Sequence, residues 1–147
     1  MHILHCVILT LITLVACDIQ TVPGSFEISG RSGVPAMHAA LLANGYVVFL
    51  DKIETWTELQ LPSGKNAYSS IYDPTTETLW PLGVPTNPFC SGGAFLADGR
   101  LASFGGNGPL TWLDDTVTDG FDAIRYLDAR GQQDAWSEPG NKLSSKR

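Results

Sequence analysis

Cysteine is the most informative of the few residues in this 147-residue chain whose type could support chemistry. Cys6 and Cys17 lie in or directly after an apolar amino-terminal stretch, and Cys90 is the one cysteine in the remainder. If the amino-terminal stretch is removed on export, Cys90 has no internal disulfide partner. Cys90 is then either a small buried hydrophobe, as most free cysteines are, or a residue with a different covalent partner.

Histidine is equally scarce, because His38 is the one histidine beyond residue 17. A His-rich zinc or copper site cannot be assembled from a single histidine, so we expect no metal site within this chain. Cys90 and His38 could be written as a nucleophile and its base. No oxyanion donor or orienting residue accompanies them, and we reject that interpretation.

Two other groups of residues invite a binding role but have the wrong spacing. The pairs Gly92-Gly93 and Gly105-Gly106 lack the Gly-Lys-Ser or Gly-Lys-Thr of a phosphate loop, so we interpret them as strand-end glycines where sheets pack closely. An acidic cluster after Trp112 is expected to be a solvated loop, and weak calcium binding is an alternative that no EF-hand spacing supports. This cluster consists of Asp114, Asp115, Asp119 and Asp122.

The composition indicates which kind of fold has to position these residues. The chain is 44% hydrophobic, 16% charged and 10% aromatic, as is ordinary for a folded domain. Nine Lys and Arg against 15 Asp and Glu give a net charge of −6 without a basic cluster, so nucleic acid is a poor partner. Fifteen Gly and nine Pro without a regular period favour turn-rich β structure over a helical bundle.

The amino terminus has the features of a secretion signal. Residues 3–16 carry no charge. This stretch is too short for a membrane span, which needs about 20 apolar residues. Its length fits a signal peptide cut next to Cys17, although His2 and the α-amino group are the only positive charge ahead of it. We predict a signal peptide over 1–17, a mature chain over 18–147, secretion, and no stable membrane association. A membrane anchor or a buried core segment is the alternative.

One sequence pattern occurs twice at a distance of 54 residues. Asn44-Gly45 separates two apolar runs, and so does Asp98-Gly99, which predicts two β-hairpins. Residues 70–74 (SIYDP) are echoed at the same distance by residues 124–128 (IRYLD). Together with the pair Gly105-Gly106, this pattern is typical of kelch repeats, each of which forms one β-propeller blade of about four strands.

The repeat length determines how much of a propeller is present. Each repeat also has a tryptophan eight to ten residues beyond its tyrosine, namely Trp80 and Trp136. Two repeats of 54 residues fill nearly all of residues 30–147, whereas propellers close with about four to eight blades. We therefore expect an all-β, kelch-like propeller that is incomplete, with about two blades present. It is either a fragment of a longer protein or is completed by other chains.

Several motifs stand in a fixed order along residues 24–147. They are SGVPAMHA (32–39), VFLDK (48–52), AYS (67–69), YD (72–73), TNPFCSGG (86–93), DGR (98–100) and GGN (105–107). In this order they closely resemble the amino-terminal region of fungal glyoxal oxidases, copper radical oxidases related to galactose oxidase. The resemblance implies a seven-bladed propeller that holds one copper ion, and a tyrosine joined through its ring to a cysteine sulfur. Cys90 matches that cysteine.

The resemblance also implies an activity and its cofactors. Small aldehydes such as glyoxal and methylglyoxal would be oxidised to carboxylic acids while O2 is reduced to H2O2, with copper and a Tyr–Cys radical as cofactors and extracellular peroxidases as users of the H2O2. The family's cross-linked tyrosine follows an Arg-Trp-Tyr motif whose arginine matches Arg147. That tyrosine, the axial tyrosine and the two copper-binding histidines are expected outside this chain, and no ligand role falls on His38. The chain alone is expected to be inactive, and the alternative is a secreted, non-catalytic kelch-like binding or structural module.

Overall fold

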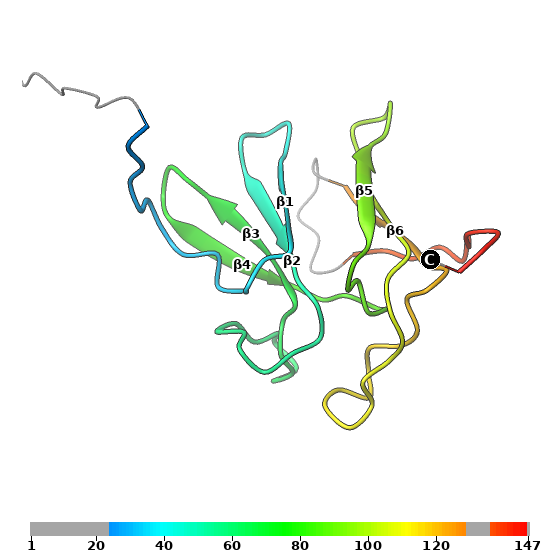
Figure 1. Cartoon of the computed structure of the whole chain (residues 1–147). Helices are drawn as coiled ribbons and strands as arrows, with labels where there is room; N and C mark the ends of the chain where they lie inside the picture. The colour runs from blue at the N-terminus through cyan, green and yellow to red at the C-terminus, as the bar shows by residue number, and fades with distance from the viewer. Residues whose placement is uncertain (1–23, 129–135, 147) are drawn as a thin grey trace, which may run out of the picture.

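The computed structural model describes residues 24–128 and 136–146, and every regular element in them is a β-strand. Figure 1 shows these strands as two separate sheets that lie side by side. No helix among the described residues could span a membrane. The predicted signal peptide over 1–17 lies outside the described residues.

The first sheet is an antiparallel meander of four strands. They are β1 (His38–Leu41), β2 (Val47–Leu50), β3 (Ser69–Asp73) and β4 (Thr78–Leu82), in the spatial order β1-β2-β3-β4. Each strand pairs with the next one along the chain. Four strands joined in this way are the arrangement of a propeller blade.

The second sheet repeats the arrangement with three strands. They are β5 (Gly92–Phe95), β6 (Leu101–Phe104) and β7 (Ile124–Leu127), in the order β5-β6-β7. An isolated antiparallel bridge joins Tyr126 to Ser137 at the outer edge of β7, where the first sheet has its fourth strand. The prediction of an all-β protein built of two blade-like sheets is therefore confirmed, and the described residues form no closed ring.

The 54-residue repeat holds in the first two strands of each sheet and slips by one residue in the third. β5 and β6 begin and end 54 residues after β1 and β2, and Gly45 and Gly99 in the two hairpin turns share a φ of 87°. In the third strand, Ile71 pairs with Val48, whereas Tyr126 pairs with Ala102, the counterpart of Val48. The distance there is 55 residues, because the loop before β7 is one residue longer, so the predicted alignment of 70–74 with 124–128 was off by one.

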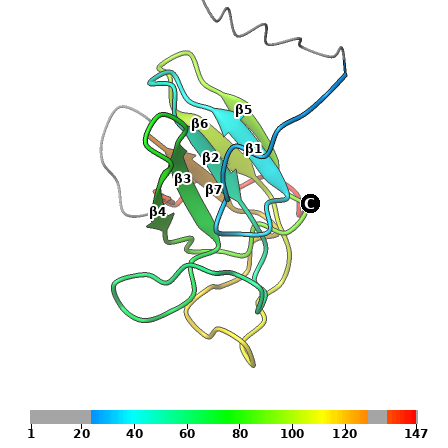
Figure 2. The same cartoon turned by 90° about the vertical axis from the view of Figure 1, so that its left-hand side faces the viewer.

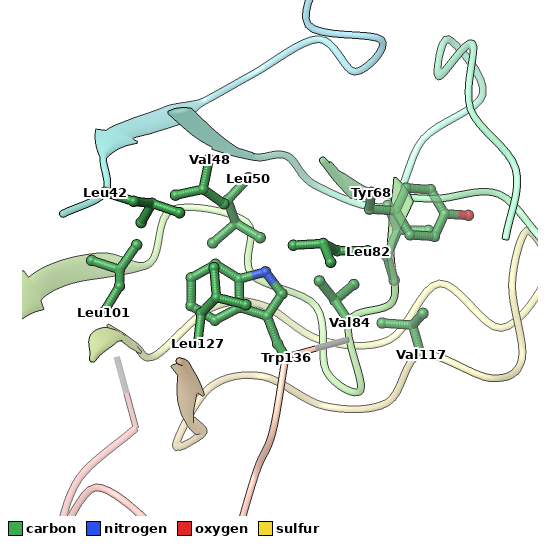
Figure 3. Packing of buried hydrophobic residues seen from close by; sticks show 11 residues of the cluster. Leu42, Val48, Leu50, Tyr68, Leu82, Val84, Leu101, Val117, Leu127 and Trp136 are labelled. Carbon is green, nitrogen blue, oxygen red and sulfur yellow. The ribbon is translucent and has the colours of Figure 1, made fainter. Parts of the chain in front are cut away.

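The two sheets face each other, with β1 opposite β5 and β2 opposite β6 (Figures 1 and 2), and residues of these four strands line one cavity. The buried side chains between them come from both repeats and form one hydrophobic cluster (Figure 3). Its members are Leu42, Val48, Leu50, Ile53, Tyr68, Leu82, Val84, Leu101, Val117, Leu127 and Trp136. Each sheet thus buries one face against the other, as neighbouring blades do.

The two tryptophans that the sequence pattern paired have different roles. Trp136 is 4% exposed, and its indole N–H donates to Ser69 Oγ in the first sheet at 2.9 Å. Trp80 is 39% exposed and stacks on Tyr46, with ring centroids 5.5 Å apart. Ile71 and Tyr126 are counterparts in the two third strands. Ile71 pairs with Trp80 and Tyr126 pairs with Ser137, so the counterpart of Trp80 is Ser137 and not Trp136. Trp136 belongs to the contact between the sheets.

This difference predicts how two tryptophan substitutions affect stability. Trp136→Ala removes a large buried ring from between the sheets and should lower the free energy of unfolding by about 3–5 kcal/mol. Trp112 is 80% exposed, and Trp112→Ala should change it by less than about 0.5 kcal/mol. Urea denaturation followed by far-UV circular dichroism measures both. Equal effects of the two substitutions would refute the assignment of Trp136 to the core.

Candidate functional site

Cys90 lies on a tight turn directly before β5, the first strand of the second sheet. Its thiol is free and its side chain is exposed. Its backbone has a φ of 63°, in the left-handed region that costs a non-glycine residue about 1–2 kcal/mol. A residue stays in such a conformation only where surrounding contacts enforce it.

The turn over residues 86–91, which we call the Cys90 turn, contains many such contacts. Within it, Phe89 N donates to Asn87 Oδ1 at 3.1 Å, and Ser91 N donates to the carbonyl of Pro88 at 2.9 Å. Asn87 also reaches out of the turn, because its Nδ2 donates to the Gly108 carbonyl at 2.8 Å. The backbone on both sides of Cys90 is therefore fixed while its side chain remains in solvent.

Beneath the turn lies Arg125 of β7, whose side chain is fully buried. With residues that the structure describes, its guanidinium makes four hydrogen bonds, to groups in the turn or at the end of β6. Nε donates to Thr86 Oγ1 (2.5 Å), Nη1 to the Gly105 carbonyl (2.8 Å) and to Ser103 Oγ (3.3 Å), and Nη2 to the Asn87 carbonyl (3.2 Å). Burial lowers the pKa of Arg125 to about 10, against an opposing effect of Glu138, so the guanidinium stays charged at neutral pH.

Two glycines let the Asn87 carbonyl oxygen enter this cluster. A Cβ on either Gly106 or Gly120 would lie 2.0 Å from that oxygen. The same Cβ would lie 3.0 Å from Arg125 Nη2 at Gly106 and 2.7 Å from it at Gly120. The expected close approach at Gly106 is therefore present, but the neighbour is the Cys90 turn rather than the other sheet. The pair Gly92-Gly93 forms the first two residues of β5, so it lies at a strand end as expected.

A comparison of two glycine substitutions tests this packing. Gly120→Ala places a methyl group against the Asn87 carbonyl without backbone strain and should lower the free energy of unfolding by about 1–3 kcal/mol. Gly108→Ala is the control, because its Cβ would meet Phe121 at an ordinary 3.5 Å, and it should change stability by less than about 0.5 kcal/mol. Chemical denaturation compares them, and a tolerated Gly120→Ala would contradict the tight clamp.

His38 has no catalytic partner in the part of the chain that the structure describes. It lies in β1 and lines a cavity of about 190 Å³ between the sheets, together with Leu50, Ser91 and Trp136. Its Nε2 is buried and has no hydrogen-bond partner among the described residues. The structure therefore forms no Cys90–His38 pair.

The four clustered aspartates pair with three different lysines, and Asp114 and Asp115 share Lys65, whose Nζ lies 3.8 Å from Asp114 Oδ1. Asp115 pairs with Lys65, Asp119 with Lys146, and Asp122 with Lys142, at 3.1, 3.6 and 3.4 Å. Across residues 24–128 and 136–146, no three His, Cys, Asp or Glu side chains gather as a metal site. The aspartates thus form ion pairs with lysines of the loops and the chain end rather than one shared cluster.

The expectation of a solvated loop is wrong for Asp114, which is buried at 3% exposure. Its Oδ2 accepts a hydrogen bond from the Tyr68 hydroxyl at 3.2 Å, and its Oδ1 accepts one from Thr116. Burial, followed by the charge of Asp114, raises the pKa of Tyr68 to about 12. Asp114 therefore joins the loop after β6 to the residue that precedes β3.

Sequence reasoning missed Asp51, which follows β2 and is 1% exposed. Neither carboxylate oxygen has a hydrogen-bond partner among the described residues. Burial raises the pKa of Asp51 to about 6 against the opposing effect of the Lys52 backbone N–H, and the charge of Glu54 adds a smaller increase. The only signal in the sequence is that a carboxylate directly follows an apolar strand.

Asp51 predicts a pH dependence of stability. Its pKa is higher in the folded state than in the unfolded chain, so from about pH 4 to pH 6 the folded state holds the extra proton and stability falls as the pH rises. Asp51→Asn should remove this contribution, on the order of 2 kcal/mol across that window. Unfolding free energies measured from pH 4 to 7 test this. Glu27→Gln, at an exposed site, is the control, and parallel profiles of the wild type and Asp51→Asn would refute the assignment.

The fold and the site together define an all-β protein with two blade-like sheets and an exposed, tightly held cysteine before the second sheet. No protein-family model matches the chain, and no solved structure matches it. A match is found to aldehyde oxidase GLOX of Vitis pseudoreticulata, 34% identical over 101 residues, which covers 58% of this chain and 19% of that protein. The chain thus spans about a fifth of that relative's length. A distant, partial relationship to this aldehyde oxidase agrees with the resemblance in the motifs. The assignment to the amino-terminal region of the fungal enzymes stays a prediction.

Proposed function

We propose that this chain is the amino-terminal part of a secreted copper radical oxidase that acts on small aldehydes such as glyoxal and methylglyoxal. The partial match to an aldehyde oxidase supports the class of enzyme. The observation that carries the proposal is the position of Cys90, an exposed free thiol on a turn that a buried charge holds in place. A cysteine that served packing alone would be buried.

In this enzyme Cys90 supplies the sulfur of a thioether to a tyrosine from another part of the propeller. The S–H bond and one ring C–H bond break, a C–S bond forms, and two electrons and two protons pass to O2 to give H2O2. The sulfur donates electron density to the ring and so eases one-electron oxidation of the phenol. This role explains an unpaired cysteine in an exported protein without a disulfide.

The described residues do not fit a copper site, since no three potential ligands come together in them. We therefore derive no copper-dependent step for these residues and propose that the ligands, like the tyrosine, lie in further blades of a seven-bladed propeller. A bound copper ion and the radical together would supply a two-electron acceptor. The balanced reaction is aldehyde, water and O2 to carboxylic acid and H2O2, and extracellular peroxidases are the proposed users of the H2O2.

Transcript sequence past the codon for Arg147 provides a first test. An in-frame Trp-Tyr followed by further repeats of about 50 residues supports the oxidase. A stop codon in every transcript would contradict it and favour the non-catalytic secreted module.

The second test is the mass of the cross-link in the product of the longer transcript. Trypsin releases Cys90 in the peptide 66–100, which contains no internal Lys or Arg. After exposure to copper and O2, we expect this peptide joined to a tyrosine peptide, at a mass two hydrogens below the sum of the two. Cys90→Ser keeps the size of the side chain but cannot form the thioether, and it should yield the peptide 66–100 alone and no oxidase activity. A wild-type protein whose Cys90 stays fully open to alkylation would overturn the assignment.

A further inference from the structure

Arg125 is a buried charge without a direct counter-ion among the described residues. Its four hydrogen bonds go to hydroxyl and carbonyl oxygens. The Glu138 carboxylate is one step away, because Thr86 Oγ1 donates to Glu138 Oε2 at 3.0 Å. Glu138 is itself paired with Lys142 at 2.7 Å. Since burying a guanidinium without a carboxylate is costly, the contacts that it makes require an explanation beyond packing.

These contacts connect both ends of the Cys90 turn to one side chain. At the start of the turn, Arg125 binds the Thr86 hydroxyl and the Asn87 carbonyl. At its end, Ser103 Oγ accepts from Arg125 and is also hydrogen-bonded to Ser91 Oγ at 3.1 Å. The guanidinium therefore sets the distance between the two ends of the turn.

The first repeat provides an internal comparison. The counterpart of Arg125 in the strand register is Ser70, and the counterpart of Cys90 is Ala36. Ser70 Oγ makes a single hydrogen bond, at 2.6 Å, to the carbonyl of Ser32, which corresponds to Thr86. The same connection between third strand and preceding segment thus exists in both repeats. The repeat with the cysteine has a charged side chain and four hydrogen bonds there.

We infer that Arg125 is the positioning residue for Cys90, because its buried guanidinium fixes the turn that presents the sulfur. This inference rests on the proposed function, in which the sulfur must meet a ring carbon held by a different segment. Small displacements of a reacting atom slow such a step strongly. Lysine cannot replace Arg125 fully, since only the planar guanidinium offers several donors in fixed directions.

The first experiment uses the 147-residue chain and does not involve copper. NMR measures the Cα and Cβ shifts of Cys90, which report its left-handed backbone, and the exchange of the Phe89 and Ser91 amides, which are bonded within the turn. Arg125→Met should abolish the left-handed signature and speed exchange of both amides by about tenfold or more relative to those of the first sheet. Arg125→Lys should restore part of the protection.

Three further variants separate positioning from stability. Leu127→Ala also removes a buried side chain from β7 and should lower the unfolding midpoint while leaving the Cys90 shifts unchanged. Arg100→Met removes a partly exposed arginine and should change neither measurement. Thr86→Val keeps the guanidinium but removes the acceptor of Arg125 Nε. It replaces Arg125→Met as the test variant if Arg125→Met does not fold. Wild-type Cys90 shifts and protection in Arg125→Lys and Thr86→Val would overturn the inference.

The second experiment follows the cross-link in the longer product by the mass of the peptide 66–100. Arg125→Met should slow thioether formation by about tenfold or more, and Leu127→Ala should not. If the wild type forms no thioether, the proposed function fails, whereas the NMR result still decides whether Arg125 holds the turn. If the wild type and Arg125→Met cross-link at the same rate, the inference fails and the proposed function stands.

Discussion

The face-to-face contact of the two sheets is the interaction on which the rest of the structure depends. The buried apolar side chains of both sheets belong to one cluster, so each sheet buries its apolar face against the other, as neighbouring blades do. Trp136 shows how closely the repeats are joined, because it follows β7 and yet donates to Ser69 in β3. The polar groups of the second repeat acquire fixed surroundings only once this contact has formed.

The Cys90 turn illustrates what such fixed surroundings allow. A left-handed cysteine is unfavourable, and so is a buried guanidinium that contacts no carboxylate among the described residues. The structure combines the two, since Arg125 gains the carbonyl and hydroxyl acceptors of the turn, and the turn gains a rigid base. Gly106 and Gly120 make room for the Asn87 carbonyl at the centre of the cluster. Two individually unfavourable features thus become consistent in one place, and two glycines provide the space.

The parts of the fold that were predictable from the sequence are those that depend on neighbouring residues. Gly45 and Gly99 adopt positive φ in their hairpin turns, as the Asn-Gly and Asp-Gly pairs predict, and the adjoining strands follow from the flanking apolar runs. The third strand was misaligned by one residue, since its register depends on a long loop and not on a turn. Trp80 and Trp136 were also wrongly equated, because the counterpart of Trp80 is Ser137, and adjacent residues of a strand point to opposite faces.

The site was predictable only at Cys90, and the reason is the sequence distance of its contacts. Arg125 binds residues 20 to 39 positions away, and in the sequence it was merely the middle of an Ile-Arg-Tyr echo. Asp114 was expected in solvent because its burial depends on Tyr68, 46 positions earlier. Local patterns cannot distinguish a buried polar residue with distant partners from an exposed one.

Asp51 and Arg125 show two outcomes of burying a charge at the same end of the two sheets. Asp51 directly follows β2, and its counterpart Gly105 follows β6 and gives its carbonyl to Arg125. Burial outweighs the one nearby backbone donor, Lys52 N–H, and the Asp51 carboxyl lowers its cost by holding a proton, as its raised pKa indicates. Arg125 keeps its charge because four acceptors replace the lost water. The second outcome yields a rigid polar cluster. This cluster lies in the second repeat, which also carries the exposed cysteine.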